Sequence, residues 1–223
     1  MPRIRRGLGD NQFYHVINRG NARNRVFHKS GDYLSFIDLM EEASARYPVK
    51  LFNYCLMPNH FHFVAEPQRA QDLSCWMQWL MTSHVRRYHA HYASTGHVWQ
   101  GRFKSFLIEE DSHLVTVARY VEANPVRASL ALSSAAWPWS SHAETVGVAP
   151  RVLTRSLPVD LPDNWTQYVD TPMSEAELEK MRRSAVRQMP YGDEEWQARV
   201  SLAYHLESTL HPLGRPRKES IHN

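Results

Sequence analysis

Two hydrophobic patterns alternate through residues 12–124 of the chain. Short runs rich in aromatic and β-branched residues predict strands, and apolar residues spaced three or four positions apart predict amphipathic helices. The predicted strands span residues 12–18, 49–57, 60–66 and 103–108, and the predicted helices span residues 32–47, 72–92 and 111–124. This order predicts an α+β fold with a ferredoxin-like antiparallel sheet, helices on one face of that sheet, and one added helix.

Turn and cap residues support these boundaries. Pro58 and Asn59 separate the second and third strands with turn chemistry, so these strands are expected to be antiparallel neighbours. Asp72 can cap the second helix, and Pro125 makes continuation of the third helix unfavourable. The face of the sheet away from the helices is then available for a site.

The pattern changes after residue 126. Residues 137–142 are typical of a structured turn and residues 150–162 of an irregular connector, whereas residues 174–189 and 193–210 favour two further helices. We therefore expect a main domain over residues 1–145 and a C-terminal extension, with helices and a basic tail, over residues 146–223.

Composition narrows the class of protein. Apolar residues make up 43% of the 223 residues, which favours a folded core. A mean hydropathy of −0.53 and the lack of a long uncharged apolar run argue against a membrane partner. The basic N-terminal stretch lacks the apolar segment of a secretory signal, so a cytoplasmic location is expected. Two cysteines offer neither a zinc quartet nor a disulfide framework.

Charge is distributed unevenly behind a net value of +3. Arginines crowd the first 25 residues, and the stretch from Leu73 to Ile108 contains no Asp or Glu. Cations interleaved with aromatic rings suit a nucleic acid, because they neutralise phosphates while the rings stack on exposed bases. An ordinary solvated face explains the charge pattern equally well.

The clearest chemical motif is His60-Phe61-His62 within the third predicted strand. Side chains alternate across a strand, so both imidazoles share one face and Phe61 points to the other. This arrangement provides half of a metal site above a packed core. The alternative is a strand with two exposed or hydrogen-bonded histidines.

The third predicted helix supplies complementary groups. Tyr120 and Asn124 are four residues apart, so they are separated by only about 40° around a helix. Both border the apolar stripe that faces the sheet, from which they could reach the histidines. A phenol beside a divalent cation can attack a phosphodiester. The alternative is a half-buried tyrosine and a helix-terminating asparagine.

Three motifs, in order, carry a family resemblance. The segments MPNHFH (57–62), VWQGRFK (98–104) and RYVEANPVRA (119–128) resemble the REP-associated tyrosine transposases, single-tyrosine members of the HUH endonuclease superfamily. The resemblance covers about residues 10–142 and implies an HUH catalytic domain within residues 1–145. It also implies His60, His62 and Asn124 as ligands of Mg²⁺ or Mn²⁺, and Tyr120 as a nucleophile that forms a 5′-phosphotyrosine with single-stranded DNA. The implied substrate is a hairpin of a repetitive extragenic palindrome, and the implied state is a monomer.

The basic and aromatic positions are expected to contact this DNA. The predicted DNA-binding residues are Arg19, Arg23, Arg25, Arg86, Arg87, Trp99, Arg102, Phe103, Lys104, Arg215, Arg217 and Lys218. Trp99 and Phe103 could stack on bases or pack in the core. The last three lie in residues 214–218, which resemble an AT-hook or form a plain basic tail.

Two other functions fit the same residues. One is a module that binds DNA hairpins without turnover. The other is a metal-dependent phosphodiesterase that uses water in place of Tyr120. Formation of a covalent protein–DNA adduct would distinguish a transposase from both of these alternatives.

Overall fold

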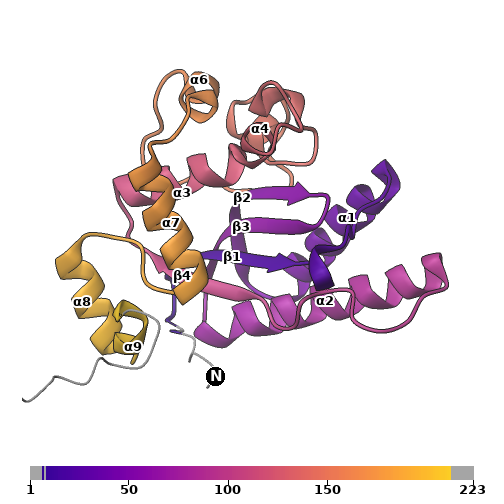
Figure 1. Ribbon diagram of the computed structural model, residues 1–223, viewed down its shortest axis with the longest axis horizontal. Coiled ribbons are helices and arrows are strands. Elements are labelled where there is room, and N and C mark those ends of the chain that lie inside the picture. Colours follow the sequence, from indigo (N-terminus) through magenta and orange to yellow (C-terminus); the bar gives the residue numbers. More distant parts are fainter. Residues whose placement is uncertain (1–6, 8, 212–223) are drawn as a thin grey trace, which may run out of the picture.

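A four-stranded antiparallel sheet forms the centre of the structure, a computed structural model that describes residue 7 and residues 9–211. The strands lie in the order β2-β3-β1-β4 (Figure 1). Their bounds are β1 Phe13–Arg19, β2 Val49–Met57, β3 His60–Pro67 and β4 Lys104–Ile108. All four predicted strands are therefore confirmed, with ends that differ by about one residue.

Two helices cover one face of the sheet, as predicted. They are α1 (Ser30–Arg46) and α2 (Ala70–Tyr92), and each connects two strands. Leu73, Trp76 and Met77 of α2 are fully buried, and they belong to one core with Phe61 and Phe63 of β3. The alternation of strand residues thus directs both phenylalanines into this core. Together with the strand order, this confirms the α+β, ferredoxin-like fold.

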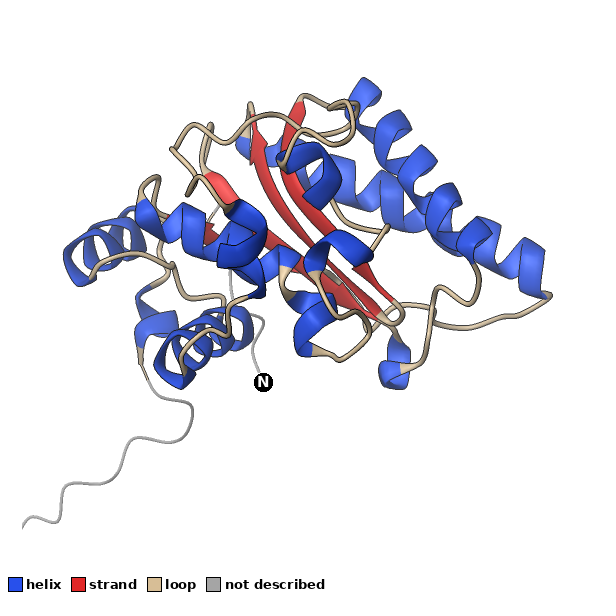
Figure 2. Cartoon of the chain, turned by 90° about the horizontal axis from the view of Figure 1, so that it is seen from above, coloured by secondary structure: helices blue, strands red, loops and turns tan. Residues whose placement is uncertain are grey.

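The opposite face is covered as well, in contrast to the open face that we expected. Helix α3 (Ser112–Glu122) contacts β2, β3 and β4, and α7 (Glu175–Arg187) contacts β4. Val117 and Val121 pack with Val64 and Met181 in a second core. Figure 2 shows helices on both sides of the sheet. A site on this face must therefore lie in a pocket between the strands and these helices.

The ends of two helices differ from the prediction. Asp72 is not the N-cap of α2 but its third residue, where its carboxylate accepts a hydrogen bond from the Arg69 backbone N–H (2.9 Å). Pro125 does not end the helical path. A separate turn, α4 (Asn124–Arg127), follows α3 because proline is tolerated in the first turn of a helix. This turn places Asn124 at the start of α4.

The C-terminal part packs against the sheet-bearing part. Short helices α5 (His142–Thr145), α6 (Trp165–Asp170) and α9 (Glu207–Leu210) accompany α7 and α8 (Glu194–Ala203), and 3₁₀ turns occur at Asn21–Arg23 and Ser134–Ala136. Helices α7 and α8 were predicted, whereas α6 was not. Tyr191 pairs with the outer edge of β4, where its N–H donates to Leu107 O (2.8 Å). The boundary near residue 145 remains a prediction.

The helices offer no membrane span. Within residue 7 and residues 9–211, even the long α2 lacks the apolar character needed to cross a bilayer.

Candidate active site

The four residues expected to form the site line one pocket of about 630 Å³. His60 and His62 come from β3, Tyr120 comes from α3, and Asn124 comes from α4. The histidines share the second face of the sheet because strand residues alternate, and α3 lies over that face. We call this cavity the active-site pocket.

His60 has a defined protonation pattern. The Asn59 amide donates from Nδ2 to Arg23 O (3.0 Å), which orients its oxygen toward His60 Nδ1 (2.6 Å). Because an amide oxygen only accepts, His60 Nδ1 carries the proton and Nε2 keeps its lone pair. Burial, followed by the charges of Arg19 and Arg127, lowers the pKa of His60 to about 4. The ring is therefore a neutral donor of the kind that binds metals.

His62 has a partner that the sequence interpretation missed, His15 of β1. His62 Nδ1 lies 2.8 Å from His15 Nε2, and both rings are buried. Burial lowers the pKa of His15 to about 3 and, with the charges of His15 and His60, lowers the pKa of His62 well below its ordinary value. His62 Nε2 has no hydrogen-bond partner among the described residues. When His62 donates from Nδ1 to His15, that orphaned nitrogen is free to bind a cation.

Asn124 presents an oxygen to the same pocket. Its Nδ2 donates to Tyr120 O (2.8 Å), so the amide nitrogen is held against the end of α3. The other amide atom, Oδ1, accepts no hydrogen bond from the described residues and remains available. An amide oxygen is a suitable ligand for a hard divalent cation.

Tyr120 lies directly among the histidines. Its ring meets the ring of His62 edge-on, with centroids 5.7 Å apart, and that of His15 at 6.1 Å. The Arg127 guanidinium lies over the tyrosine ring, 4.6 Å from its centroid. The side chain is 8% exposed but lines the pocket. The helical spacing of Tyr120 and Asn124 thus brings both toward the histidine pair.

The pocket is positively charged. No Asp or Glu is found among the described residues that line it. Its cationic lining residues are Arg19, Arg102, Lys104, Arg127 and Arg182. The last two arginines were not predicted. Such a lining favours the phosphates of a nucleic acid.

Other predicted DNA-binding residues lie in different places. Arg23 and Arg25 are exposed beyond the end of β1. Arg86 and Arg87 are adjacent but line different surface pockets of α2. Arg215, Arg217 and Lys218 fall outside the described residues.

The two aromatic residues proposed to stack on bases are core residues. Trp99 is 4% exposed and Phe103 is 8% exposed, and both pack in the core beneath α1 and α2. Rings buried to this extent present no open face to a base. We therefore do not retain Trp99 and Phe103 as DNA-stacking residues.

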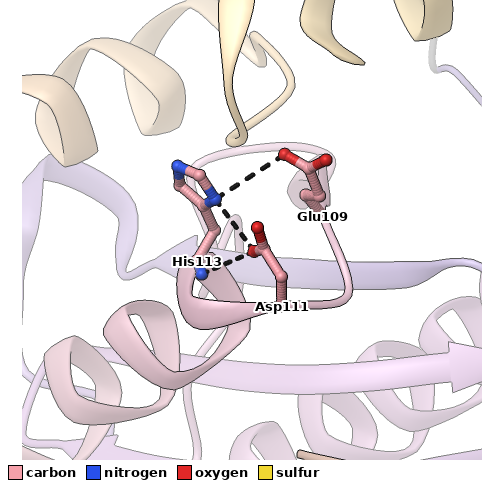
Figure 3. A group of neighbouring side chains, drawn as sticks. All are labelled: Glu109, Asp111 and His113. Carbon is pink, nitrogen blue, oxygen red and sulfur yellow. Dashed lines mark hydrogen bonds and ion pairs between the residues drawn. The ribbon is translucent and has the colours of Figure 1, made fainter.

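A second group could hold a cation at the start of α3. Ligand atoms of Glu109, Asp111 and His113 lie within 4.8 Å of one another (Figure 3). Most of these atoms already have partners. Asp111 accepts the His113 N–H as the α3 cap (2.7 Å), and Glu109 accepts the Asp193 N–H (2.8 Å). Lys180 Nζ lies 3.3 Å from His113 Nε2, and its positive charge would repel a cation bound at this group. These bonds favour a structural role.

Comparison with known proteins gives consistent results. The family model described as "Transposase IS200 like" matches residues 10–124. A Haemophilus influenzae (strain ATCC 51907 / DSM 11121 / KW20 / Rd) protein, provisionally named a REP-associated tyrosine transposase, is 25% identical over 122 residues, which cover 49% of this chain and 69% of that protein. The solved structure of a REP-associated tyrosine transposase bound to a REP hairpin covers 78% of this chain and 96% of its own, with a TM-score of 0.55 and 19% identity. That structural likeness shows a shared fold.

The family match extends over more than half of the chain and contains the histidine pair, Tyr120 and Asn124. These are the side chains that meet in the active-site pocket. The chain therefore belongs to the IS200-like transposase family, and it is similar to a REP-associated tyrosine transposase.

Proposed function

We propose that the active-site pocket cleaves and rejoins single-stranded DNA through a 5′-phosphotyrosine on Tyr120. The observation that carries this proposal is the meeting of Tyr120, the histidine pair and Asn124, from three elements, in one cationic pocket. We further propose hairpins of repetitive extragenic palindromes as the substrate. The solved structure of the related transposase, described as bound to a REP hairpin, supports that substrate class.

The pocket fits a divalent cation. His60 Nε2, the orphaned His62 Nε2 and Asn124 Oδ1 would hold Mg²⁺ or Mn²⁺, because two neutral imidazoles and an amide oxygen suit these ions. When bound, such an ion polarises the scissile phosphate and stabilises charge on the leaving oxygen. Both imidazoles are already neutral, so no proton need leave them before binding.

The reaction conserves the phosphodiester bond energy. Tyr120 Oη bonds to phosphorus as the bond from phosphorus to the 3′ oxygen of the preceding nucleotide breaks. The phenol proton passes to solvent, and the departing 3′ oxygen takes up a proton to become a 3′-hydroxyl. In the rejoining step a 3′-hydroxyl attacks the phosphotyrosine and loses its proton to solvent, while the bond from phosphorus to Tyr120 Oη breaks and Oη takes up a proton.

Cationic side chains would position the DNA for this attack. Arg19, Arg102 and Lys104 line the pocket on the side of β1 and β4, and Arg127 lies over the nucleophilic ring. Arg23 and Arg25 extend the positive surface beyond β1. Phosphate contacts of this kind fix the register of a strand without reading its sequence.

The decisive experiment detects a covalent adduct. A labelled single-stranded DNA hairpin of palindromic sequence is incubated with the protein and Mn²⁺. The proposal predicts a labelled protein band that is resistant to denaturation and disappears in Tyr120→Phe. Tyr47→Phe provides a matched control, because Tyr47 is the C-cap of α1 and lines a different pocket, so this variant should retain the adduct.

Two results would replace the proposal. Cleavage that survives Tyr120→Phe would show that water is the nucleophile and that the protein is a phosphodiesterase. Specific hairpin binding without cleavage in either Mg²⁺ or Mn²⁺ would show a binding module.

A further inference from the structure

A second pocket, of about 180 Å³, lies between the start of α1 and the outer half of α2. We call it the α1–α2 pocket and define it by Lys29, Asp32, His84, Arg87, Tyr88 and His91. It shares no lining residue with the active-site pocket among the described residues. Figure 1 shows that α2 continues past the end of the sheet.

The sequence of α2 changes character along a single face. Its first half buries Leu73, Trp76, Met77 and Leu80, which are spaced by three or four residues. The same spacing then continues with His84, Arg87, Tyr88 and His91. Packing residues on the inward stripe are thus replaced by polar, cationic and aromatic side chains. These groups are suited to contact a ligand.

His84 places a hydrogen-bond donor at the base of the pocket. Its Nδ1 accepts the indole N–H of Trp99 (3.2 Å), so the proton of the neutral ring lies on Nε2. Burial lowers the pKa of His84 to about 4, which keeps the ring neutral. The residue is only 4% exposed, lines the pocket, and has no partner for Nε2 among the described residues.

Asp32 places an acceptor in the same pocket. Its Oδ2 accepts from the backbone N–H groups of His28 (2.7 Å) and Lys29 (3.1 Å) and from the Tyr92 hydroxyl (2.7 Å). The other oxygen, Oδ1, accepts none of the hydrogen bonds in the described part of the chain. A free donor and a free acceptor together complement the edge of a nucleobase, which presents both kinds of group.

The remaining lining suits a nucleotide. Arg87 and Lys29 can neutralise a phosphate, and Tyr88 offers an aromatic ring. The volume corresponds to roughly six molecules of liquid water, enough for one base and too little for a base pair. Trp99 connects the two pockets along the chain, because its indole N–H donates to His84 and the next residue, Gln100, lines the active-site pocket. We propose that the α1–α2 pocket takes one unpaired base of the single-stranded DNA bound at Tyr120, an inference that rests on the proposed function.

Filling the pocket tests this proposal. A Cβ added at Gly31, in the pocket lining, would meet no atom within 4 Å, so Gly31→Leu adds a bulky side chain to the lining without a clash. The probes are four fluorescein-labelled hexanucleotides, one for each base, bound in EDTA and followed by anisotropy. Gly31→Leu should weaken the best-bound hexamer about tenfold. Ser30→Leu, outside the lining, should change its affinity less than twofold.

Substitution of two adjacent arginines provides the second comparison. Arg87→Gln and Arg86→Gln remove the same charge from adjacent positions of α2, but only Arg87 lines the α1–α2 pocket. Arg87→Gln should weaken binding several times more than Arg86→Gln. Equal losses in both variants, together with wild-type affinity in Gly31→Leu, would overturn the proposal, because they indicate a general electrostatic surface.

Photocrosslinking separates this proposal from the proposed function. A hexamer that contains 4-thiothymidine should crosslink to Tyr88 or His91, located by sequencing of the tryptic peptide 88–102, in wild type and in Tyr120→Phe, but not in Gly31→Leu. A crosslink found there, in a wild-type protein that forms no Tyr120 adduct, would contradict the proposed function but support a nucleotide-binding pocket. A normal Tyr120 adduct with crosslinks only at other residues would contradict the proposal that the α1–α2 pocket binds a base.

Discussion

His15 shows how a residue outside the expected motif shapes the site. Its Nε2 lies 2.8 Å from His62 Nδ1, and both rings are enclosed by the sheet and α3. A histidine that ligates a metal usually donates its other N–H to a nearby acceptor, which sets the tautomer and the ring orientation. We therefore regard His15 as a positioning residue for His62.

Substitution of His15 should weaken metal binding without affecting DNA affinity. His15→Phe keeps a buried ring but removes the acceptor for His62 Nδ1, so Mn²⁺ affinity should fall about 10–100-fold. Hairpin affinity in EDTA should stay near that of wild type. Titration of Mn²⁺ by electron paramagnetic resonance measures the first quantity, and anisotropy measures the second.

A matched change at the other candidate cation site provides the control. His113→Phe alters the Glu109–Asp111–His113 group and should leave Mn²⁺ affinity unchanged. If His113→Phe lowers that affinity and His15→Phe does not, the ion binds at the start of α3 and the role given to His15 is wrong.

Helix α3 is held in place by a buried carboxylate two residues from both Tyr120 and Asn124. Glu122 is 0% exposed. Its two oxygens accept five hydrogen bonds, from Asn53 (2.6 Å), Ser141 (2.9 Å), His142 (2.7 Å), Thr145 (2.8 Å) and Trp165 (2.8 Å). These donors come from β2, from the segment around α5 and from α6. The carboxylate therefore links α3 to three separate parts of the chain.

Loss of the Glu122 charge should destabilise the whole fold. Glu122→Gln places an amide N–H₂ against these donors, so we expect a loss of about 2–4 kcal/mol in the free energy of unfolding. Glu177→Gln is the control, because Glu177 is partly exposed and its 3.7 Å pair with Arg119 should contribute less than about 1 kcal/mol. Urea denaturation measures both, and equal losses would contradict the role of Glu122.

The same carboxylate predicts a pH dependence. Burial raises the pKa of Glu122, but hydrogen bonds from His142, Trp165 and Thr145 outweigh burial and leave the pKa below its ordinary value. A group whose pKa is lower in the folded state stabilises the fold above its unfolded pKa, about 4.3, and this contribution is lost as the pH falls through the folded pKa. Wild-type stability should thus decrease below about pH 4.3 more steeply than that of Glu122→Gln.

Local spacing explains why some of these features could be predicted and others could not. Tyr120 and Asn124 lie within one helical turn, and His60 and His62 lie within one strand, so sequence spacing alone sets their relative directions. The role of His15 depends on the pairing of β1 with β3, which brings Ile17 opposite His62 across the sheet. The partners of Glu122 are likewise distant in sequence. The charge pattern around Trp99 could not reveal that the ring packs inward, because burial is a tertiary property.

At the scale of the whole molecule, the C-terminal part completes the site-bearing core. Met173, Met181 and Tyr191 belong to the core beneath α3, and Trp165 donates to Glu122. Arg182 of α7 lines the active-site pocket. The predicted boundary near residue 145 would therefore separate two parts that share one hydrophobic core.

Two truncations test whether the first part folds alone. A chain that ends at residue 145 loses these core side chains and exposes the apolar surface of α3, so it should bind the dye ANS and unfold without a sharp thermal transition. A chain that ends at Leu213 keeps every described helix, so its melting temperature should stay within about 2 °C of the full chain. The second truncation also removes Arg215, Arg217 and Lys218, and hairpin affinity should fall if they form the expected DNA contact. A cooperative transition in the shorter chain would show instead that residues 1–145 are an independent domain.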